Sequence, residues 1–160
     1  MTQDIFLQLS GIAGESQDAN HRDNIDVFSW EWQVYQAAAL HGGNGGGAGK
    51  SSVNDLIIEH YTDRASPNLL KYCLTGKPIA SATLVIRKAG GNPLEYLKIT
   101  MHEVMITGVA ITSDIHMAQP REEVSLSFAR FTLEYVVQNA QGGSAGTVSI
   151  GYDIKANREI

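Results

Sequence analysis

The sequence predicts an all-β protein, a β-barrel of antiparallel strands with one short α-helix and an extended Gly-rich loop. Three observations support this prediction. Apolar and polar residues alternate with period two over most of the chain, one segment carries the start and stop signals of a helix, and a glycine-rich run separates two strand patterns. With 160 residues, 43% hydrophobic and 18% charged, the chain fits a single domain over residues 1–160 with a buried core.

Two strands are predicted in the N-terminal quarter of the chain. The first alternates at Ile5, Leu7 and Leu9, and the second runs from Ile25 to Gln36. One face of the second strand is mainly aromatic and carries Phe28, Trp30, Trp32 and Val34. The other face is polar and carries Ser29, Glu31 and Gln33. We expect the aromatic face to pack into the core and the polar face to contact water.

Five further strands follow the same pattern. They are predicted at Asp55–Tyr61, Ile79–Lys88, Tyr96–Ile111, Val124–Gln138 and Thr147–Ile154. A turn at residues 89–93, where Gly, Asn and Pro favour chain reversal, joins Ile79–Lys88 to Tyr96–Ile111. Gly108 is the predicted bulge in a strand too long to stay flat. The last strand is expected to bury Val148, Ile150, Tyr152 and Ile154.

One helix is predicted between the third and fourth strands. Ser66 is the expected N-cap, Pro67 occupies the first helical position, and Gly76 ends the helix in a left-handed conformation. The apolar stripe of this helix consists of Leu69, Leu70, Cys73 and Leu74. On this stripe Cys73 is expected to be a small buried residue rather than a nucleophile.

The most unusual composition lies between residues 40 and 52. This candidate contact loop contains Leu40, His41, Gly42, Gly43, Asn44, Gly45, Gly46, Gly47, Ala48, Gly49 and Lys50. Its end, Gly49-Lys50-Ser51, is similar to a phosphate-binding loop, but Asn44 stands where that motif requires glycine. Strand patterns also flank the loop on both sides, whereas a phosphate loop leads into a helix. A β–β connection is therefore the better interpretation.

No other pattern indicates catalysis or a cofactor. The five histidines have no metal-site spacing, so we expect them to be surface or hydrogen-bonded residues, with His21 fixing the polar loop Gly11–Arg22. The pattern Gly-x-Ser-x-Gly occurs at Gly142-Gly143-Ser144-Ala145-Gly146, but we interpret this run as a short flexible turn between two strands, whereas a nucleophile elbow leads from a strand into a helix. The net charge of −5 argues against nucleic acid, and no apolar run reaches the length of a membrane span. We expect no catalytic residues, no metal and no cofactor.

A series of short segments resembles the Hcp family, whose members form the tube of bacterial type VI secretion systems. The matching segments follow the family's order along nearly the whole chain. They are Gly14-Glu15-Ser16, Asp18, His21, Ile25-Asp26-Val27, Ser29-Trp30-Glu31-Trp32, Ser66-Pro67-Asn68-Leu69-Leu70, Gly76-Lys77, Ile86-Arg87-Lys88-Ala89-Gly90, Glu95-Tyr96-Leu97, Met101–Val109, Glu122–Phe128, Tyr152-Asp153-Ile154 and Asn157. Tyr152 departs conservatively from the Trp found near this place in many members.

The resemblance implies a structural subunit rather than an enzyme. It implies a homohexameric ring, stacked rings inside a contractile sheath, a VgrG-type spike at the tip, and small effectors held in the lumen. It also implies folding in the cytoplasm and secretion without a signal peptide, and the N-terminal residues show no such signal. A monomeric β-barrel enzyme or ligand carrier is the competing interpretation.

Joining the resemblance to the strand pattern assigns two candidate regions. Ser29, Glu31 and Gln33 are the candidate lumen residues, although alternation alone leaves open that this face lies outside, under the sheath. The loop from Leu40 to Lys50 is the candidate contact to a neighbouring subunit or ring, because a glycine-rich excursion can add to another chain.

Overall fold

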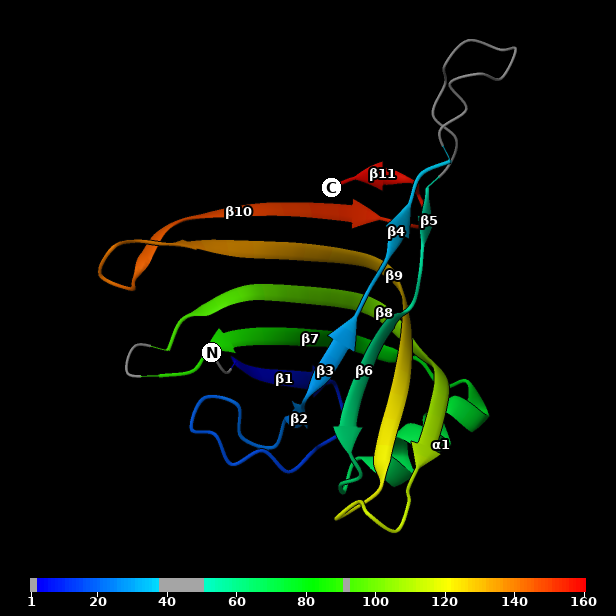
Figure 1. The fold of residues 1–160 in the computed structure, drawn as a ribbon. Helices are drawn as coiled ribbons and strands as arrows, with labels where there is room; N and C mark the ends of the chain where they lie inside the picture. The colour runs from blue at the N-terminus through cyan, green and yellow to red at the C-terminus, as the bar shows by residue number, and fades with distance from the viewer. Residues whose placement is uncertain (1–2, 38–50, 91–92) are drawn as a thin grey trace.

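The computed structural model describes residues 3–37, 51–90 and 93–160. The fold class is as predicted, because antiparallel strands dominate and one short helix accompanies them (Figure 1). The elements are β1 (Gln3–Leu9), β2 (Ile25–Val27), β3 (Ser29–Glu31), β4 (Val34–Tyr35), β5 (Ser52–Val53), β6 (Leu56–Tyr61), α1 (Ser66–Thr75), β7 (Ile79–Lys88), β8 (Glu95–Thr112), β9 (Arg121–Gln138), β10 (Ser144–Asp153) and β11 (Arg158–Glu159).

A large, strongly curled sheet forms the body of the molecule. Its strand order is β11-β10-β9-β8-β7-β1-β2, and β6 joins β9 while β3 joins β6. β8 and β9 contain 18 residues each and take part in both layers that Figure 1 shows crossing each other. The predicted bulge at Gly108 is confirmed, because the register of β8 on β9 shifts between Ile106 and Gly108.

The two layers of the barrel are joined by a covalent connection in the chain at Phe28. Among the described strands the ladder ends at β2 on one side and at β3 on the other, and only Phe28 separates them. The Phe28 amide donates to the Glu59 carbonyl at 3.0 Å, so pairing with β6 begins at once. A covalent connection therefore stands where a closed barrel has a row of hydrogen bonds.

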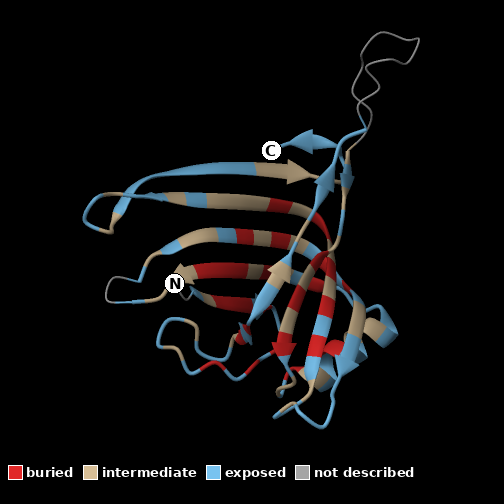
Figure 2. Cartoon of the chain, in the orientation of Figure 1, coloured by how far each residue is buried: buried red, intermediate tan, exposed pale blue. Residues whose placement is uncertain are grey.

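The core lies between the two layers. Leu7, Ile58, Leu84, Met101 and Leu126 are fully buried, and they come from β1, β6, β7, β8 and β9. Figure 2 shows the buried residues concentrated on β1, β7 and the lower part of β9, while β10 is mostly exposed. The core thus occupies one side of the large sheet.

The single strand predicted from Ile25 to Gln36 is wrong, because three short strands replace it. Ile25 and Val27 are buried on β2, but the half-buried Trp30 and Trp32 follow with the opposite parity. The change occurs at Phe28, which is 41% exposed and packs on Tyr61 at a ring distance of 4.9 Å. Val34 is also exposed, on the two-stranded β4–β5 sheet.

The helix has the predicted ends except for its cap. Pro67 lies in the first turn and Gly76 has φ 66°, as expected, but the N-cap is Ala65 rather than Ser66. Ser66 instead accepts a hydrogen bond from the Asp63 amide, and Asp63 accepts one from the Ala65 amide. The turn before the helix is therefore stabilised by these two side chains.

Two predictions of burial, for Cys73 on the helix and for the last strand, are also wrong. On α1 only Leu69 is fully buried, Cys73 is half-buried, and Leu70 and Leu74 are exposed. On β10 Val148 and Ile150 are exposed, and of the predicted set only Tyr152 and Ile154, which follows the strand, are partly buried. Both errors have one physical reason, which is that each apolar face extends beyond the layer that covers it.

Candidate assembly surfaces

The inner face of the large sheet is apolar across its whole width. Residues directly opposite each other on neighbouring strands point to the same face. One row of such partners is Leu7, Leu84, Ile99, Leu133 and Ile150. The next row is Ile5, Ile86, Leu97, Tyr135 and Val148. These rows begin in the core and end at β10.

In both rows the residues at the β10 end are far more exposed than those on β1 and β7. Leu7, Leu84 and Ile99 are fully buried, whereas Ile150 at the end of their row is 47% exposed. In the second row exposure rises from 5% at Ile5 to 65% at Val148. The covering strands β2, β3 and β6 lie over the inner part of the sheet, and β8, β9 and β10 extend past them to the left in Figure 1.

We name this uncovered region the overhang and define it by its large apolar side chains. They are Leu133, Tyr135, Val137, Val148 and Ile150. Val137 is 40% exposed and shares the face of Tyr135 by alternation along β9. Hydrophobic side chains that continue a core face into solvent are typical of a surface that another protein covers.

A second apolar surface lies beside the helix. Leu70, Leu74 and Met105 are 41%, 78% and 38% exposed, and we name them the helix-side patch. Met105 lies against the end of α1, since a Cβ placed on Gly76 would be 3.8 Å from its terminal methyl group. A groove of about 870 Å³ continues the patch past Met105, with Pro78, Ala80, Phe128, Ala129 and Ile154 among its walls.

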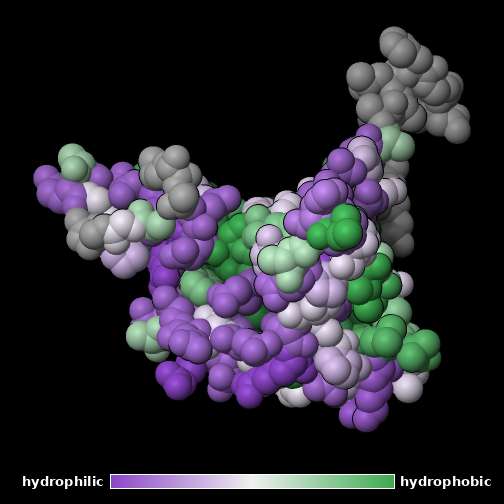
Figure 3. All heavy atoms as spheres, turned by 60° about the horizontal axis from the view of Figure 1, so that its bottom comes forward, coloured by the Kyte–Doolittle hydropathy of each residue, from purple (hydrophilic) through white to green (hydrophobic). Residues whose placement is uncertain are grey.

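These two surfaces are carried by different elements. In Figure 1 β9 and β10, which carry the overhang, run side by side along the upper part of the large sheet, and α1 lies at the lower right. Figure 3 shows hydrophobic residues reaching the surface in several separate places, between hydrophilic regions. The molecule therefore presents two different apolar surfaces rather than one self-complementary patch.

Several strand edges are also unpaired among the described residues. β10 pairs with β9 over its length, but on its other edge it meets β11 only at Tyr152 and Asp153. β8 beyond Ile106 pairs with β9 alone, and β3 pairs with β6 alone. Free edges present backbone donors and acceptors on which another chain can add a strand.

The structure places the candidate lumen residues on one exposed polar face. Ser29 and Glu31 point away from the core, and Trp30 between them packs against it. Across β6, β9 and β8 their rows continue as Glu59, Glu123 and Ala110, and as Ile57, Ser125 and Gly108. Gln33 follows β3, is exposed, and accepts a hydrogen bond from the Tyr35 hydroxyl at 2.6 Å.

This polar face is predominantly acidic. Glu59 and Glu123 are direct cross-strand partners, with Glu31 on the same face, and Arg121 is the basic residue of the adjoining row. None of these three glutamates has an ion pair among the described residues. Like charges placed directly opposite each other on neighbouring strands are destabilising, so the face carries an electrostatic cost.

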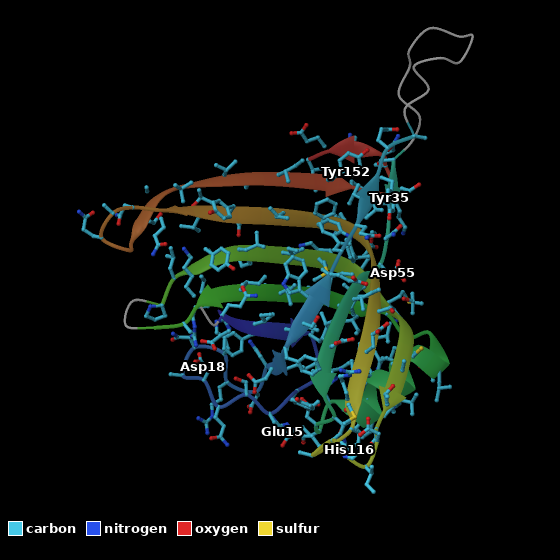
Figure 4. The ribbon with its side chains drawn as sticks, in the orientation of Figure 1. Glu15, Asp18, Tyr35, Asp55, His116 and Tyr152 are labelled. Carbon is cyan, nitrogen blue, oxygen red and sulfur yellow. The ribbon has the colours of Figure 1, made fainter. Side chains whose placement is uncertain are left out.

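The loop from Gly11 to Arg22 is fixed by charge. Both oxygens of Asp18 accept hydrogen bonds from the Arg87 guanidinium, at 2.7 and 3.0 Å, and Asp4 accepts another at 2.9 Å. The hydrogen bonds from Arg87 lower the pKa of Asp18 to about 2. Figure 4 shows Asp18 and Glu15 on this loop, below the large sheet.

His21 fixes the same loop, as predicted. Its Nε2 lies 2.7 Å from Glu95 Oε2, its Nδ1 is 3.2 Å from Asn24 Nδ2, and its ring stacks on Phe6 at 4.4 Å. Arg64 holds the loop from the other side, donating to the Gly14 carbonyl at 2.6 Å. The loop is therefore an ordered part of the wall.

The prediction that the histidines are surface or hydrogen-bonded residues is wrong for His60. Its side chain is fully buried and lies 3.7 Å from Glu122 Oε1 and 3.8 Å from Asp63 Oδ2, with no hydrogen bond to either ring nitrogen among the described residues. Burial acts to raise the pKa of Glu122, but nearby His60 and Ser66 outweigh it and the pKa is lowered. Burial raises the pKa of Asp63. The sequence carried the signal, because His60 alternates with Leu56 and Ile58 and therefore shares their buried face.

No group of three or more His, Cys, Asp or Glu side chains in the described part of the chain is arranged to hold a metal ion. No helix within residues 3–37, 51–90 and 93–160 combines the length and apolar character needed to cross a membrane. The loop from Leu40 to Lys50 lies outside the described residues, and the strands at its two ends, β4 and β5, pair with each other.

Comparison with known proteins gives consistent matches. The family model for the type VI secretion system effector Hcp matches residues 6–135. Protein hcp1 from Pseudomonas aeruginosa is 40% identical over 159 residues, covering 98% of each chain. The crystal structure of Hcp1 from Salmonella typhimurium is 46% identical with TM-score 0.81, covering 100% of both chains. A type VI secretion system effector from Yersinia pestis is 42% identical with TM-score 0.78, covering 94% of this chain and 99% of that one.

Proposed function

The chain belongs to the Hcp family of type VI secretion proteins, and we propose that it is the tube subunit of such a system, forming hexameric rings that stack. Hcp proteins are structural, secreted tube and effector proteins rather than enzymes, so membership does not favour the alternative of a β-barrel enzyme or ligand carrier. In this proposal residues 1–160 act as one domain, and contraction of a surrounding sheath drives the tube outward.

The overhang is the observation that carries the proposal. A strand whose alternation is typical of burial has Val148 65% exposed and Ile150 47% exposed. Exposing these side chains is unfavourable in water, and covering apolar surface contributes about 25 cal/mol per Å². Assembly with other copies provides that cover. An enzyme or carrier that acts as a monomer has no such use for this face.

The face of Ser29 and Glu31, with the adjacent Gln33, is proposed to line the lumen. Its support is the polar row that continues over four strands, with the aromatic residues of the same segment turned to the core. A polar wall holds a small effector loosely, which allows the effector to dissociate after the tube has been secreted. The alternative is that this face lies outside the ring, under the sheath. A structure of the assembled ring would distinguish the two placements.

The loop from Leu40 to Lys50 is proposed to contact the adjacent ring or subunit. Its support is position, because the β4–β5 ribbon that carries it extends away from the barrel in Figure 1. The proposed partners outside the ring are a VgrG-type spike, the contractile sheath and small secreted effectors. The proposed route is folding in the cytoplasm followed by secretion through the type VI system without a signal peptide.

Size-exclusion chromatography with light scattering tests the ring. We expect a species near six times the chain mass of 17.3 kDa. The double variant Val148→Glu/Ile150→Glu places two charges on the overhang and is expected to be a monomer with an unchanged circular dichroism spectrum, because both side chains are already exposed. The matched control is Ile115→Glu, which changes a residue that is 92% exposed outside the overhang. Rings in the double variant, or a monomeric parent at micromolar concentration, would contradict the proposal.

A further inference from the structure

A pocket of about 460 Å³ lies at the end of β6 and is not part of either apolar surface described above. We name it the aromatic pocket, and its walls include Phe28, Tyr61, His116, Met117, Gln119 and Arg121. We propose that it binds the C-terminal aromatic residue of a polypeptide, with the ring against Phe28 and Tyr61 and the carboxylate on Arg121. This inference rests on the proposed function, because it names the chemistry by which the polar face holds an effector.

The pocket is built from segments of one chain. Tyr61 ends β6 and Arg121 begins β9, and the two are direct cross-strand partners. The loop between β8 and β9 supplies His116, which Figure 4 shows at the lower end of the molecule. Asp114 accepts a hydrogen bond from the His116 amide at 2.7 Å, and this bond helps to fix the loop. Assembly is therefore not needed to form the pocket.

Two aromatic side chains give the pocket its apolar part. Phe28 and Tyr61 pack on each other at a ring distance of 4.9 Å, yet they remain 41% and 49% exposed. Ligand sites are typically concave, with apolar and aromatic walls and a few polar groups that set the orientation. Another aromatic ring can add to such a pair in offset or edge contact. The apolar part of the ligand is therefore an aromatic side chain.

Arg121 gives the pocket its charge. Its guanidinium has no ion pair among the described residues. A guanidinium matches a carboxylate through two parallel hydrogen bonds. Glu59 and Glu123 lie on the same face, one cross-strand pair away from Tyr61 and Arg121. Because Coulomb repulsion scales with charge, these glutamates disfavour a phosphate dianion more than a carboxylate.

A C-terminal aromatic residue combines both parts of the ligand. It carries a ring and a carboxylate on the same residue, whereas an internal Asp or Glu carries no ring. A chain end also enters the pocket with a single connection to the rest of the polypeptide. The tilted aromatic pair and the neighbouring arginine of this pocket therefore fit a chain end that terminates in Phe, Tyr or Trp.

Saturation-transfer NMR titration of the full chain with short peptides tests the ligand. The probe is acetyl-Gly-Gly-Phe with a free carboxylate. Its amide lacks the charge, and acetyl-Gly-Gly-Ala lacks the ring. We expect each of these two to bind about tenfold more weakly or worse, since a hydrogen bond to a charged group or a ring contact is lost. Equal binding of all three peptides, or tighter binding of phenyl phosphate, would overturn the proposal.

Substitutions in the pocket test the place of binding. Arg121→Gln is expected to weaken binding of acetyl-Gly-Gly-Phe about tenfold. Phe28→Leu keeps an apolar side chain but removes the ring, and it should also weaken binding. The matched control is Arg158→Gln, because Arg158 is exposed on β11, outside the pocket. Unchanged binding to Arg121→Gln, or an equal loss from Arg158→Gln, would overturn the assignment.

The variant Val148→Glu/Ile150→Glu separates this inference from the ring. Since one chain forms the whole pocket, we expect this variant to bind acetyl-Gly-Gly-Phe as the parent does. A parent that forms rings but does not bind the peptide would overturn the inference and leave the ring standing. A monomeric parent that binds the peptide through Arg121 would overturn the ring and leave the peptide site standing.

Discussion

His60 on β6 and Glu122 on β9 are direct cross-strand partners with fully buried side chains, and His60 Nε2 lies 3.7 Å from Glu122 Oε1. Asp63 Oδ2 lies 3.8 Å from the other ring nitrogen, close to the turn that starts α1. This cluster places polar side chains, rather than apolar ones, between the barrel wall and the turn that starts α1. Removing His60 takes away a neighbour that lowers the pKa of Glu122, and a buried carboxylate left without such a neighbour is costly.

His60→Leu is therefore expected to destabilise the fold by about 3–5 kcal/mol. His60→Leu/Glu122→Leu is expected to recover most of that loss, because the carboxylate of Glu122 is then no longer left buried without its neighbour. Urea unfolding in the Val148→Glu/Ile150→Glu background measures this without the contribution of assembly. A double variant no more stable than His60→Leu would show that the cluster does not act as a pair.

The same cluster predicts a pH dependence for Glu122→Gln. Because the folded pKa of Glu122 is lowered, its ionised form contributes stability above the ordinary value of 4.5, and this contribution is lost as pH falls through the folded pKa. The raised pKa of Asp63 acts in the opposite sense, but Asp63 is present in both proteins. The stability gap between parent and Glu122→Gln should therefore be widest near neutral pH and narrow on acidification. A stability difference between parent and Glu122→Gln that widens toward low pH would contradict the lowered pKa of Glu122.

The Arg87–Asp18 pair predicts the behaviour of the loop from Gly11 to Arg22. Asp18→Asn removes the ionised acceptor and should increase protease cleavage within this loop. In the parent the protection is expected above the ordinary Asp pKa of 3.8, and it is lost as pH falls toward about 2, since the folded pKa is lowered. Asp26→Asn is the control, because Asp26 is exposed on β2 and has no ion pair among the described residues. Equal cleavage of both variants would contradict the proposed role of the Arg87–Asp18 pair in holding this loop.

The facing pair Glu59 and Glu123 predicts a stabilising substitution. Glu123→Gln should raise the free energy of unfolding by about 0.2–1 kcal/mol, because it removes a like-charge cross-strand contact. The gain should shrink in high salt, which screens exposed charges. Glu134→Gln is the matched control, because Glu134 lies 3.4 Å from Lys98 and its loss removes an attraction. A gain of equal size from Glu134→Gln would show that total charge, not the pair, is responsible.

How much of the fold could be predicted depended on what alternation measures. It identified β7, β8, β9 and the bulge at Gly108, because period two reports a strand with one buried face. The turn predicted at residues 89–93 lies partly outside the described residues. Alternation missed the break at Phe28, because the chain changes layers there and both parities become buried in turn. The apolar and polar residues of Ile25–Gln36 therefore continue to alternate as in a single strand, although the backbone changes direction at Phe28.

The candidate surfaces were predictable in part for a related reason. Alternation places Val148 and Ile150 on one apolar face, but it does not say whether this chain or a neighbour covers that face. The same holds for Leu70 and Leu74 on α1. The buried His60 could have been predicted from its alternation with Leu56 and Ile58, whereas its approach to Glu122 depends on the register of β6 on β9.

The glycine-rich loop gives a prediction that separates stacking from ring formation. Deleting Gly42 to Gly49 shortens the connection between β4 and β5, which pair with each other at Val34–Val53 and Tyr35–Ser52 and so retain a local base. The overhang and the helix-side patch lie elsewhere, so the hexameric mass should be unchanged in light scattering. Glycine loses much conformational entropy when ordered, so a loop this rich in glycine is expected to be held by contacts that a neighbouring ring supplies. Electron microscopy under conditions in which the parent forms tubes should therefore show single rings for the deletion. Normal tubes would mean that other surfaces hold the rings together.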